Sequence, residues 1–131
     1  MTYEEVGSYF ENFFKNKRIK YSNESELGEL NYDFYIGSLE IAFDIEVILE
    51  EDECLVEEII IHLTVSDDED TYYENDYSEI LDGSEIFVLE DIYEQLLELS
   101  KIIPKVKKKA KELEELCDEH NLRLADFIAF N

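Results

Sequence analysis

Hydrophobic and polar residues alternate through the central part of the chain, from Leu39 to Val65. Between residues 39 and 49 every second position is apolar, and most of the positions between them carry a carboxylate. This period of two is typical of a strand with one buried face. It resumes after the acidic run at residues 50–53 and continues from Leu55 to Val65. The pattern predicts a long hairpin whose inner face supplies much of the core.

A further strand is expected immediately before this hairpin, at residues 29–36. The apolar side chains that alternate there with polar ones are Leu30, Tyr32, Phe34 and Ile36. The dipeptide Gly37-Ser38 follows, with glycine first, as a two-residue type II′ hairpin turn prefers. Three consecutive antiparallel strands between residues 29 and 66 therefore form a meander.

The next part of the chain interrupts the apolar pattern. Residues 67–77 contain six acids and three tyrosines, which predicts either a loop or a short exposed helix. Asp82-Gly83 marks a turn, and the apolar run from Ile86 to Leu89 is a candidate fourth strand.

Helices are expected at both ends of the chain. Thr2 and Glu5 form a capping-box pattern, and the apolar residues behind it recur at helical spacing. Those residues are Val6, Tyr9, Phe10, Phe13 and Phe14. An aromatic stripe at this spacing is typical of core, so we expect the N-terminal helix to be buried along it.

The C-terminal region predicts more than one helical piece. A helix opens near Asp91 and buries Ile92, Leu96, Leu99 and Ile103. Pro104 is expected to break or kink it, because proline lacks the N–H donor and its ring clashes with the carbonyl of Ser100. A second segment with Val106, Ala110, Leu113 and Leu116 or Cys117 inward stops near Asn121. A last apolar helix at 122–130 then docks on the sheet.

Together these elements predict an α+β fold in a single domain, residues 1–131. The N-terminal helix and the C-terminal helices pack on one face of a small antiparallel meander of three or four strands. A chain of 131 residues with 45% hydrophobic content is large enough for one core. We find neither a signal-peptide pattern nor an apolar run of membrane-spanning length, so the expected location is the cytoplasm.

The distribution of charged residues is the feature of the sequence that bears most directly on function. The formal net charge is −24, and residues 21–100 hold 26 of the 35 acids but no lysine or arginine. Four of the 11 basic residues precede this stretch and seven follow it. A net charge of this size indicates what kind of partner the protein binds, and it says little about the fold. It excludes nucleic acid and anionic membranes as direct ligands and favours a basic protein surface or cations.

Patterns for catalysis or metal binding are missing from the sequence. There is no glycine-rich phosphate loop and no nucleophile with a base at recognisable spacing. His62 falls in mid-strand, which favours a structural role, and Cys117 with His120 supplies too few ligands for zinc. An EF-hand loop beginning at Asp67 or Asp68 would place its glycine on a tyrosine. We therefore expect no enzyme activity, no cofactor and no metal site.

The carboxylates themselves are the remaining candidate site. Alternate side chains on a strand lie about 6.6 Å apart, a spacing of the same order as that of phosphates along a nucleic-acid strand. Tyrosines among the acids can stack on and hydrogen-bond to arginine. The predicted partner-binding residues are Glu40, Asp44, Glu46, Glu50, Glu51, Asp52, Glu53, Asp67, Asp68, Glu69, Asp70, Tyr72, Tyr73, Glu74, Asp76 and Tyr77.

In size, charge and its mixture of acids and tyrosines, mainly at residues 24–98, the chain resembles the nucleic-acid mimics encoded by phages, which include anti-CRISPR and anti-restriction proteins. The resemblance implies a stoichiometric inhibitor that occupies the basic DNA- or RNA-binding groove of a CRISPR or restriction effector in the host-cell cytoplasm. Two alternatives stay open. One is an immunity protein that neutralises a basic toxin nuclease, and the other is a structural or adaptor subunit. A homodimer also stays open.

Overall fold

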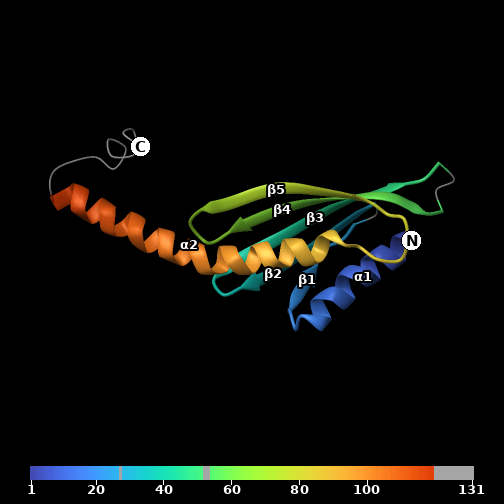
Figure 1. Cartoon of the computed structure of the whole chain (residues 1–131), viewed down its shortest axis with the longest axis horizontal. Coiled ribbons are helices and arrows are strands. Elements are labelled where there is room, and N and C mark those ends of the chain that lie inside the picture. Colours follow the sequence, from blue (N-terminus) through green and yellow to red (C-terminus); the bar gives the residue numbers. More distant parts are fainter. Residues whose placement is uncertain (27, 52–53, 120–131) are drawn as a thin grey trace. The chain divides into compact units, whose positions relative to one another are not determined.

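The computed structural model describes residues 1–26, 28–51 and 54–119 and has an α+β fold (Figure 1). Its elements, in chain order, are α1 (Tyr3–Asn16), β1 (Tyr21–Asn23), β2 (Glu29–Ile36), β3 (Leu39–Leu49), β4 (Val56–Ser66), β5 (Thr71–Ile80) and α2 (Val88–Glu119). The chain divides into two compact units, residues 1–96 and residues 97–131, called here the first and the second unit. The boundary between them falls inside α2.

The five strands form one antiparallel sheet in the order β1-β2-β3-β4-β5, so each strand pairs with its neighbours in sequence. The expected meander of β2, β3 and β4 is confirmed, whereas the expected number of three or four strands is too small. Gly37 has a φ of 61° between β2 and β3, while Ser38 is not among the residues with positive φ. A positive φ at the first central position alone fits the predicted type II′ turn.

Strand β5 corrects the interpretation of residues 67–77 as a loop or an exposed helix. Only residues 67–70 form a connection, and Thr71–Ile80 pairs with β4 along its length. The register changes between Val65 and Ser66, where β5 begins. Both sides of β5 carry polar residues, so the segment lacks the alternation of a half-buried strand. Backbone pairing with β4, at an edge of the sheet, is what makes it a strand.

Helix α2 differs from the expectation at two places. It begins at Val88, so the run from Ile86 to Leu89 is not a fourth strand. It also continues through Pro104 to Glu119 as one helix, so the predicted break is wrong. Strong helix formers on both sides of the proline offset the loss of one intrahelical hydrogen bond. The expected stop at Asn121 and the expected helix at 122–130 lie outside the described residues.

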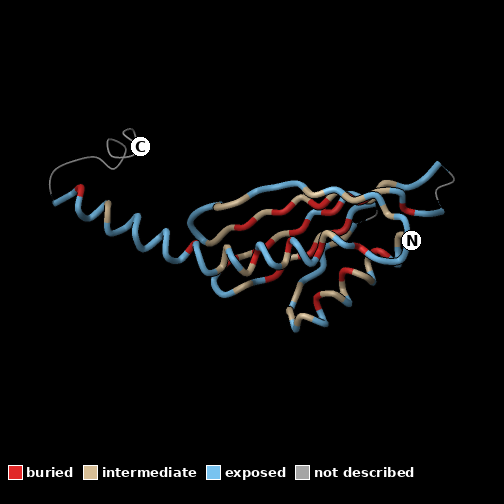
Figure 2. Tube along the Cα trace, in the orientation of Figure 1, coloured by how far each residue is buried: buried red, intermediate tan, exposed pale blue. Residues whose placement is uncertain are grey.

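The core of the first unit lies between α1 and one face of the sheet (Figure 2). Phe14 is fully buried, and its ring centroid lies 5.2 Å from that of Phe34 and 5.8 Å from that of Phe43. Phe10 stacks on Tyr32 at 5.9 Å. The predicted core role of the aromatic stripe is therefore confirmed at its centre.

The predicted start of α1 is also confirmed. The Thr2 hydroxyl accepts the backbone N–H of Glu5 at 3.2 Å and donates to its carboxylate at 3.1 Å. The first turns of α2 contact α1 through the rings of Phe13 and Tyr93, 5.9 Å apart. Among the described residues, neither helix combines the length and the apolar character needed to cross a bilayer.

Candidate protein-binding surface

The sheet of the first unit has a second face, opposite the one that packs on α1, which we call the outer face. Strand register assigns to it every second residue of β2 to β5, and each of these side chains is at least partly exposed. Its carboxylates are Glu29, Asp33, Glu40, Asp44, Glu46, Glu58, Glu74 and Asp76. They come from four neighbouring strands, none of which contains lysine or arginine.

Antiparallel pairing arranges these acids in two dimensions. Glu29 on β2 lies directly opposite Glu46 on β3, and Asp44 on β3 lies opposite His62 on β4. Neighbouring strands are about 4.8 Å apart, and successive side chains on one face are separated by about 6.6 Å along a strand. The outer face is therefore a grid of negative charge rather than a single line.

The pKa of Asp33 on this face is raised by burial and by neighbouring carboxylates. Partial burial raises the pKa of its carboxyl group above the usual value, and the negative charges of Glu24, Glu40 and Asp44 raise the pKa further. Like charges disfavour ionisation when they are close and poorly screened. The carboxylates of β2 and β3 thus act on one another.

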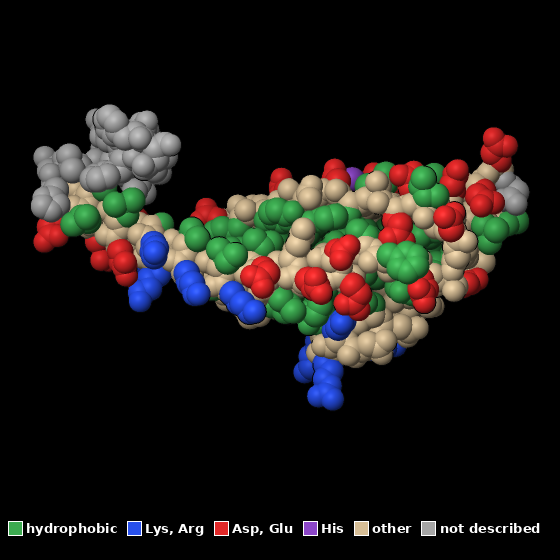
Figure 3. All heavy atoms as spheres, viewed as in Figure 1, with side chains coloured by type: hydrophobic (Ala, Val, Ile, Leu, Met, Phe, Trp, Pro, Cys, Tyr) green, Lys and Arg blue, Asp and Glu red, His purple; other side chains and the backbone are tan. Residues whose placement is uncertain are grey.

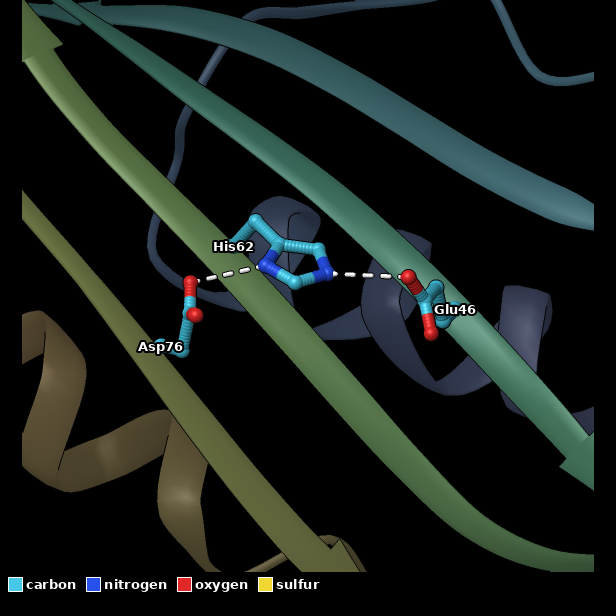
Figure 4. Close-up of polar contacts among 3 residues, drawn as sticks. All are labelled: Glu46, His62 and Asp76. Carbon is cyan, nitrogen blue, oxygen red and sulfur yellow. Dashed lines mark hydrogen bonds and ion pairs between the residues drawn. The ribbon is translucent and has the colours of Figure 1, made fainter.

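His62 lies in the middle of the outer face, between carboxylates of both neighbouring strands (Figure 4). Its Nδ1 is 2.7 Å from Asp76 Oδ1 on β5, and its Nε2 is 3.2 Å from Glu46 Oε1 on β3. The hydrogen bond to Asp76 is the main cause of a raised pKa of the imidazole. Burial opposes this shift, and the bond to Glu46 and the two negative charges add to it. The expectation of a structural role overlooked these partners, because they lie on other strands.

The predicted line of acids on β3 is only partly present. Glu40, Asp44 and Glu46 lie on the outer face, as the alternation predicts. Glu50 and Glu51 are exposed but follow the end of β3, where the pairing with β4 becomes irregular. The remaining two predicted acids of this connection, Asp52 and Glu53, lie outside the described residues.

The acids at residues 67–70 form a compact connection between β4 and β5. Asp67 Oδ1 accepts the backbone N–H groups of Glu69 at 2.8 Å and Asp70 at 2.9 Å, and Oδ2 accepts the Tyr72 hydroxyl at 2.6 Å. Asp68, Glu69 and Asp70 are exposed. Asp67 therefore organises the turn, and its three acidic neighbours are accessible.

The structure separates two tyrosines of β5, Tyr73 and Tyr77, from the acids of the same strand, whereas Tyr72 is hydrogen-bonded to Asp67. Glu74 and Asp76 lie on the outer face, whereas Tyr73 and Tyr77 lie on the side of the core. The Tyr77 hydroxyl donates to the side chain of Gln95 on α2 and lies 2.9 Å from the Tyr73 hydroxyl. Partial burial raises the pKa of Tyr77, and its hydrogen bond to Tyr73 raises it further. These two tyrosines hold β5 and α2 together.

The predicted set omitted three acids of the outer face, namely Glu29, Asp33 and Glu58. Asp33 and Glu29 belong to β2, and Glu58 belongs to β4. Their alternation with apolar residues was visible in the sequence. Their place beside the acids of β3 also depends on how β2 and β4 pair with β3, which sequence alternation does not determine.

The net charge is confined to the first unit. Residues 1–96 contain 28 acids and four bases, a difference of 24, whereas residues 97–131 contain seven of each. Figure 3 shows the lysine and arginine side chains in view at the end of α1 and along the part of α2 in the second unit. Lys17 is paired with Glu90 at 3.1 Å. Local pairing thus neutralises little of the first unit's charge.

Among the residues that the structure describes, no group of three His, Cys, Asp or Glu side chains is arranged to hold a metal ion. Comparisons of the chain with protein-family models, curated proteins and solved structures found no match.

Proposed function

We propose that this protein is a stoichiometric inhibitor that mimics nucleic acid. Its outer face occupies the basic DNA- or RNA-binding groove of a CRISPR or restriction effector and excludes the nucleic acid. The observation that carries the proposal is the grid of eight carboxylates on four neighbouring strands without a lysine or arginine among them. Basic grooves bind polyanions largely through phosphate charge, independently of sequence, so a surface with comparable charge density competes for the same side chains.

Rigidity supports this function. The outer-face carboxylates are attached to strands whose opposite side chains are fully packed, for example Ile45 and Ile61 at 0% exposure. A backbone held in its binding geometry loses little conformational entropy on association. Within the first unit, α1 and the first turns of α2 lie on the other face of the sheet.

Electrostatics supports fast association. A strongly charged surface steers an oppositely charged partner, and such encounters reach about 10⁸–10⁹ M⁻¹s⁻¹ at low salt. The screening length near physiological ionic strength is about 8 Å, so the association rate falls as salt is added. Salt dependence therefore measures how much of the binding is electrostatic.

The test is competition with nucleic acid. A panel of purified CRISPR effectors, restriction endonucleases and a toxin nuclease is titrated with labelled DNA or RNA, with and without this protein. We expect one-to-one inhibition of nucleic-acid binding for a CRISPR or restriction effector. Inhibition of the toxin nuclease alone would favour an immunity protein. A partner that binds this protein and its nucleic acid simultaneously, without loss of affinity, would contradict mimicry.

A matched pair of variants distinguishes the effect of the outer-face carboxylates on binding from the effect of net charge. The first carries Glu29→Gln, Asp44→Asn and Glu74→Gln on the outer face. The control carries Asp82→Asn, Glu85→Gln and Glu94→Gln, which remove the same charge from exposed positions of α2 and of residues 81–87, called here the β5–α2 connector. Three surface ion pairs are together worth about 0.6–3 kcal/mol, so the outer-face variant should lose about threefold to hundredfold in affinity and the control much less. Equal losses in both variants would show that net charge, not this face, determines binding.

A further inference from the structure

Strand β5 leaves one edge of the sheet free (Figure 1). It is the last strand in the order β1-β2-β3-β4-β5, and among the described residues no other strand pairs with its second side. The opposite edge strand, β1, has three residues, whereas β5 has ten. A long edge strand presents a row of backbone N–H and C=O groups to which another strand can bond. The backbone of β5 is therefore a candidate binding surface in its own right.

The pairing with β4 determines which backbone groups of β5 point out of this edge. The N–H of Leu81 donates to the carbonyl oxygen of Glu57 at 2.9 Å, in the same register that places Ile80 opposite Glu58. In an antiparallel pair, hydrogen-bonded and non-hydrogen-bonded positions alternate. Residues 73, 75, 77 and 79 therefore turn their backbone groups towards β4. The residues between them turn their backbone N–H and C=O groups out of the sheet, and these are Glu74, Asp76, Ser78 and Ile80.

This edge is accessible and regular. All four residues that turn their backbone groups outward are exposed. Natural edge strands are commonly protected by lysine, by proline or by a bulge that bends the edge away. Strand β5 contains neither lysine nor proline, and its change of register lies at its start, so residues 73–80 pair with β4 in one continuous register. The outward backbone groups therefore form an even row that a further strand can extend.

Charge determines which strand fits this edge. Glu74 and Asp76 point to the outer face, beside strands that contain no lysine or arginine. Opposite charges on directly opposed residues of two strands stabilise the pair, and like charges destabilise it. An overlapping second copy of β5 brings its own acids beside these two, so repulsion disfavours it. A strand with a basic residue at every second position instead places positive charge beside both acids.

We propose that the free edge of β5 binds an extended, lysine- or arginine-rich segment of the partner protein as an added antiparallel strand. Antiparallel addition continues the pattern of the sheet and is the slightly more stable form of pairing. Basic residues of the segment lie opposite Glu74 and Asp76, and an apolar residue lies opposite Ile80, whose side chain is 70% exposed. This inference rests on the proposed function for the basic character of the partner, and it adds that one segment of the partner joins the sheet.

The first test uses a synthetic peptide as long as β5, in which lysine alternates with threonine. Amide hydrogen exchange of the full chain, followed by NMR, should slow at Glu74, Asp76 and Ser78 when the peptide binds, whereas Asn75 and Tyr77 are already protected by β4. Absence of binding, or binding without this protection, would overturn the proposal, because attraction by charge alone leaves the edge amides exposed. Protection that appears without peptide and increases with protein concentration would show a second copy on the edge and would also overturn it.

Backbone methylation of the same peptide distinguishes hydrogen bonding from charge. In the proposed pairing the lysines lie opposite Glu74 and Asp76 at hydrogen-bonded positions, so the lysine N–H groups point at β5 and the threonine N–H groups point away. Methylating the lysine amides should weaken binding about tenfold or more, the equivalent of about two hydrogen bonds, whereas methylating the threonine amides should change it little. Both peptides keep the same charge, length and number of methyl groups. Equal affinities of the two peptides would overturn the proposal.

Proline at Ser78 makes the corresponding change in the protein. The N–H of Ser78 points away from β4, so Ser78→Pro removes no hydrogen bond of the sheet, and edge strands tolerate proline at such positions. Its affinity for the peptide should be about tenfold lower than that of Ser78→Ala, which keeps the N–H. Circular dichroism of both variants checks that the chain remains folded.

The same two variants distinguish failure of this inference from failure of the proposed function. Ser78→Pro keeps every charge of the outer face but should inhibit the effector about tenfold more weakly than Ser78→Ala. If a folded Ser78→Pro inhibits as well as Ser78→Ala, the strand addition is wrong and the proposed function stands. If the wild type does not compete with nucleic acid for any effector, the proposed function is wrong, whereas the peptide measurements, which use no effector, still decide whether β5 accepts a basic strand.

Discussion

Protonation of His62 should stabilise the fold, and Glu46 and Asp76 are the reason. A neutral imidazole has one N–H and donates to one carboxylate, whereas imidazolium donates to both. Both ring nitrogens lie within hydrogen-bonding distance of a carboxylate oxygen, at 2.7 Å and 3.2 Å. Asp44 also occupies the position directly opposite on β3. The geometry therefore favours the charged form in the folded state.

The size of this contribution follows from the exposure of the groups. The side chain of His62 is 37% exposed, and its two partners are more exposed, so solvent screens both ion pairs. Exposed pairs are typically worth about 0.2–1 kcal/mol each. Two such pairs give about 0.5–2 kcal/mol, and His62→Gln should lose this amount at pH values where the wild-type imidazole is charged.

The stability that His62 contributes should decrease as pH rises. Because the pKa of His62 is raised in the folded state, the folded state binds the proton more tightly than the unfolded state does. The stabilisation is complete below the unfolded-state pKa and disappears as pH rises through the folded-state pKa. Urea unfolding followed by circular dichroism at about pH 5.5 and about pH 8 should therefore separate the wild type from His62→Gln at the lower pH only.

Two results would refute this reasoning. One is a difference between the wild type and His62→Gln that stays constant from acid to alkaline pH. The other is an NMR titration in which the pKa of His62 is at or below its usual value. His120→Gln is the matched control, since it makes the same substitution at the other histidine of the chain.

Further predictions concern the core, the start of α2 and salt. Phe14→Ala should lower the free energy of unfolding by about 3–5 kcal/mol, whereas Phe87→Ala, at a side chain 71% exposed, should change it by less than about 0.5 kcal/mol. Glu79→Ala should cost about 1–2 kcal/mol, because its carboxylate accepts the N–H groups of Phe87 and Val88 at 3.0 Å and 2.8 Å. Glu85→Ala, at an exposed acid of the β5–α2 connector, should be nearly neutral in the same urea titrations. Added salt should raise the unfolding midpoint by screening repulsion in the first unit, yet weaken inhibition of the proposed effector.

The parts of the fold that could be predicted are those with a local signal. Strands β2 to β4 carry an apolar residue at every second position over most of their length, and α1 has its capping residues beside the first turn. Strand β5 has no such signal, since Tyr73, Asn75 and Glu79 on its inner side are all polar or partly polar. Its conformation depends on pairing with β4, which is a long-range property. At Pro104 the local rule allowed a break or a kink, and the predicted break is absent because the helix formers around the proline continue the helix.

The candidate surface was predictable within one strand and not between strands. Glu40, Asp44 and Glu46 share a face by alternation alone. The contacts of His62 with Glu46 and Asp76 join residues 16 and 14 positions apart, and they exist only in one register of two hairpins. The same register separates Tyr73 and Tyr77 from the acids of β5. Sequence reasoning identified the acidic composition, whereas the shape of the acidic surface required the sheet.

The fold does not by itself explain why the outer face is acidic. Alternation requires only that these positions tolerate solvent, and Thr64, Ser66 and Ser78 satisfy that requirement on the same face. Like charges directly opposite each other, such as Glu29 and Glu46, destabilise a sheet, and cross-strand pairs are worth about 0.2–1 kcal/mol. Lysine protects exposed strands from aggregation as well as acids do, yet the strands contain none. The sheet itself therefore does not require carboxylates at these positions, and the cationic binding groove proposed above would account for their sign and their density.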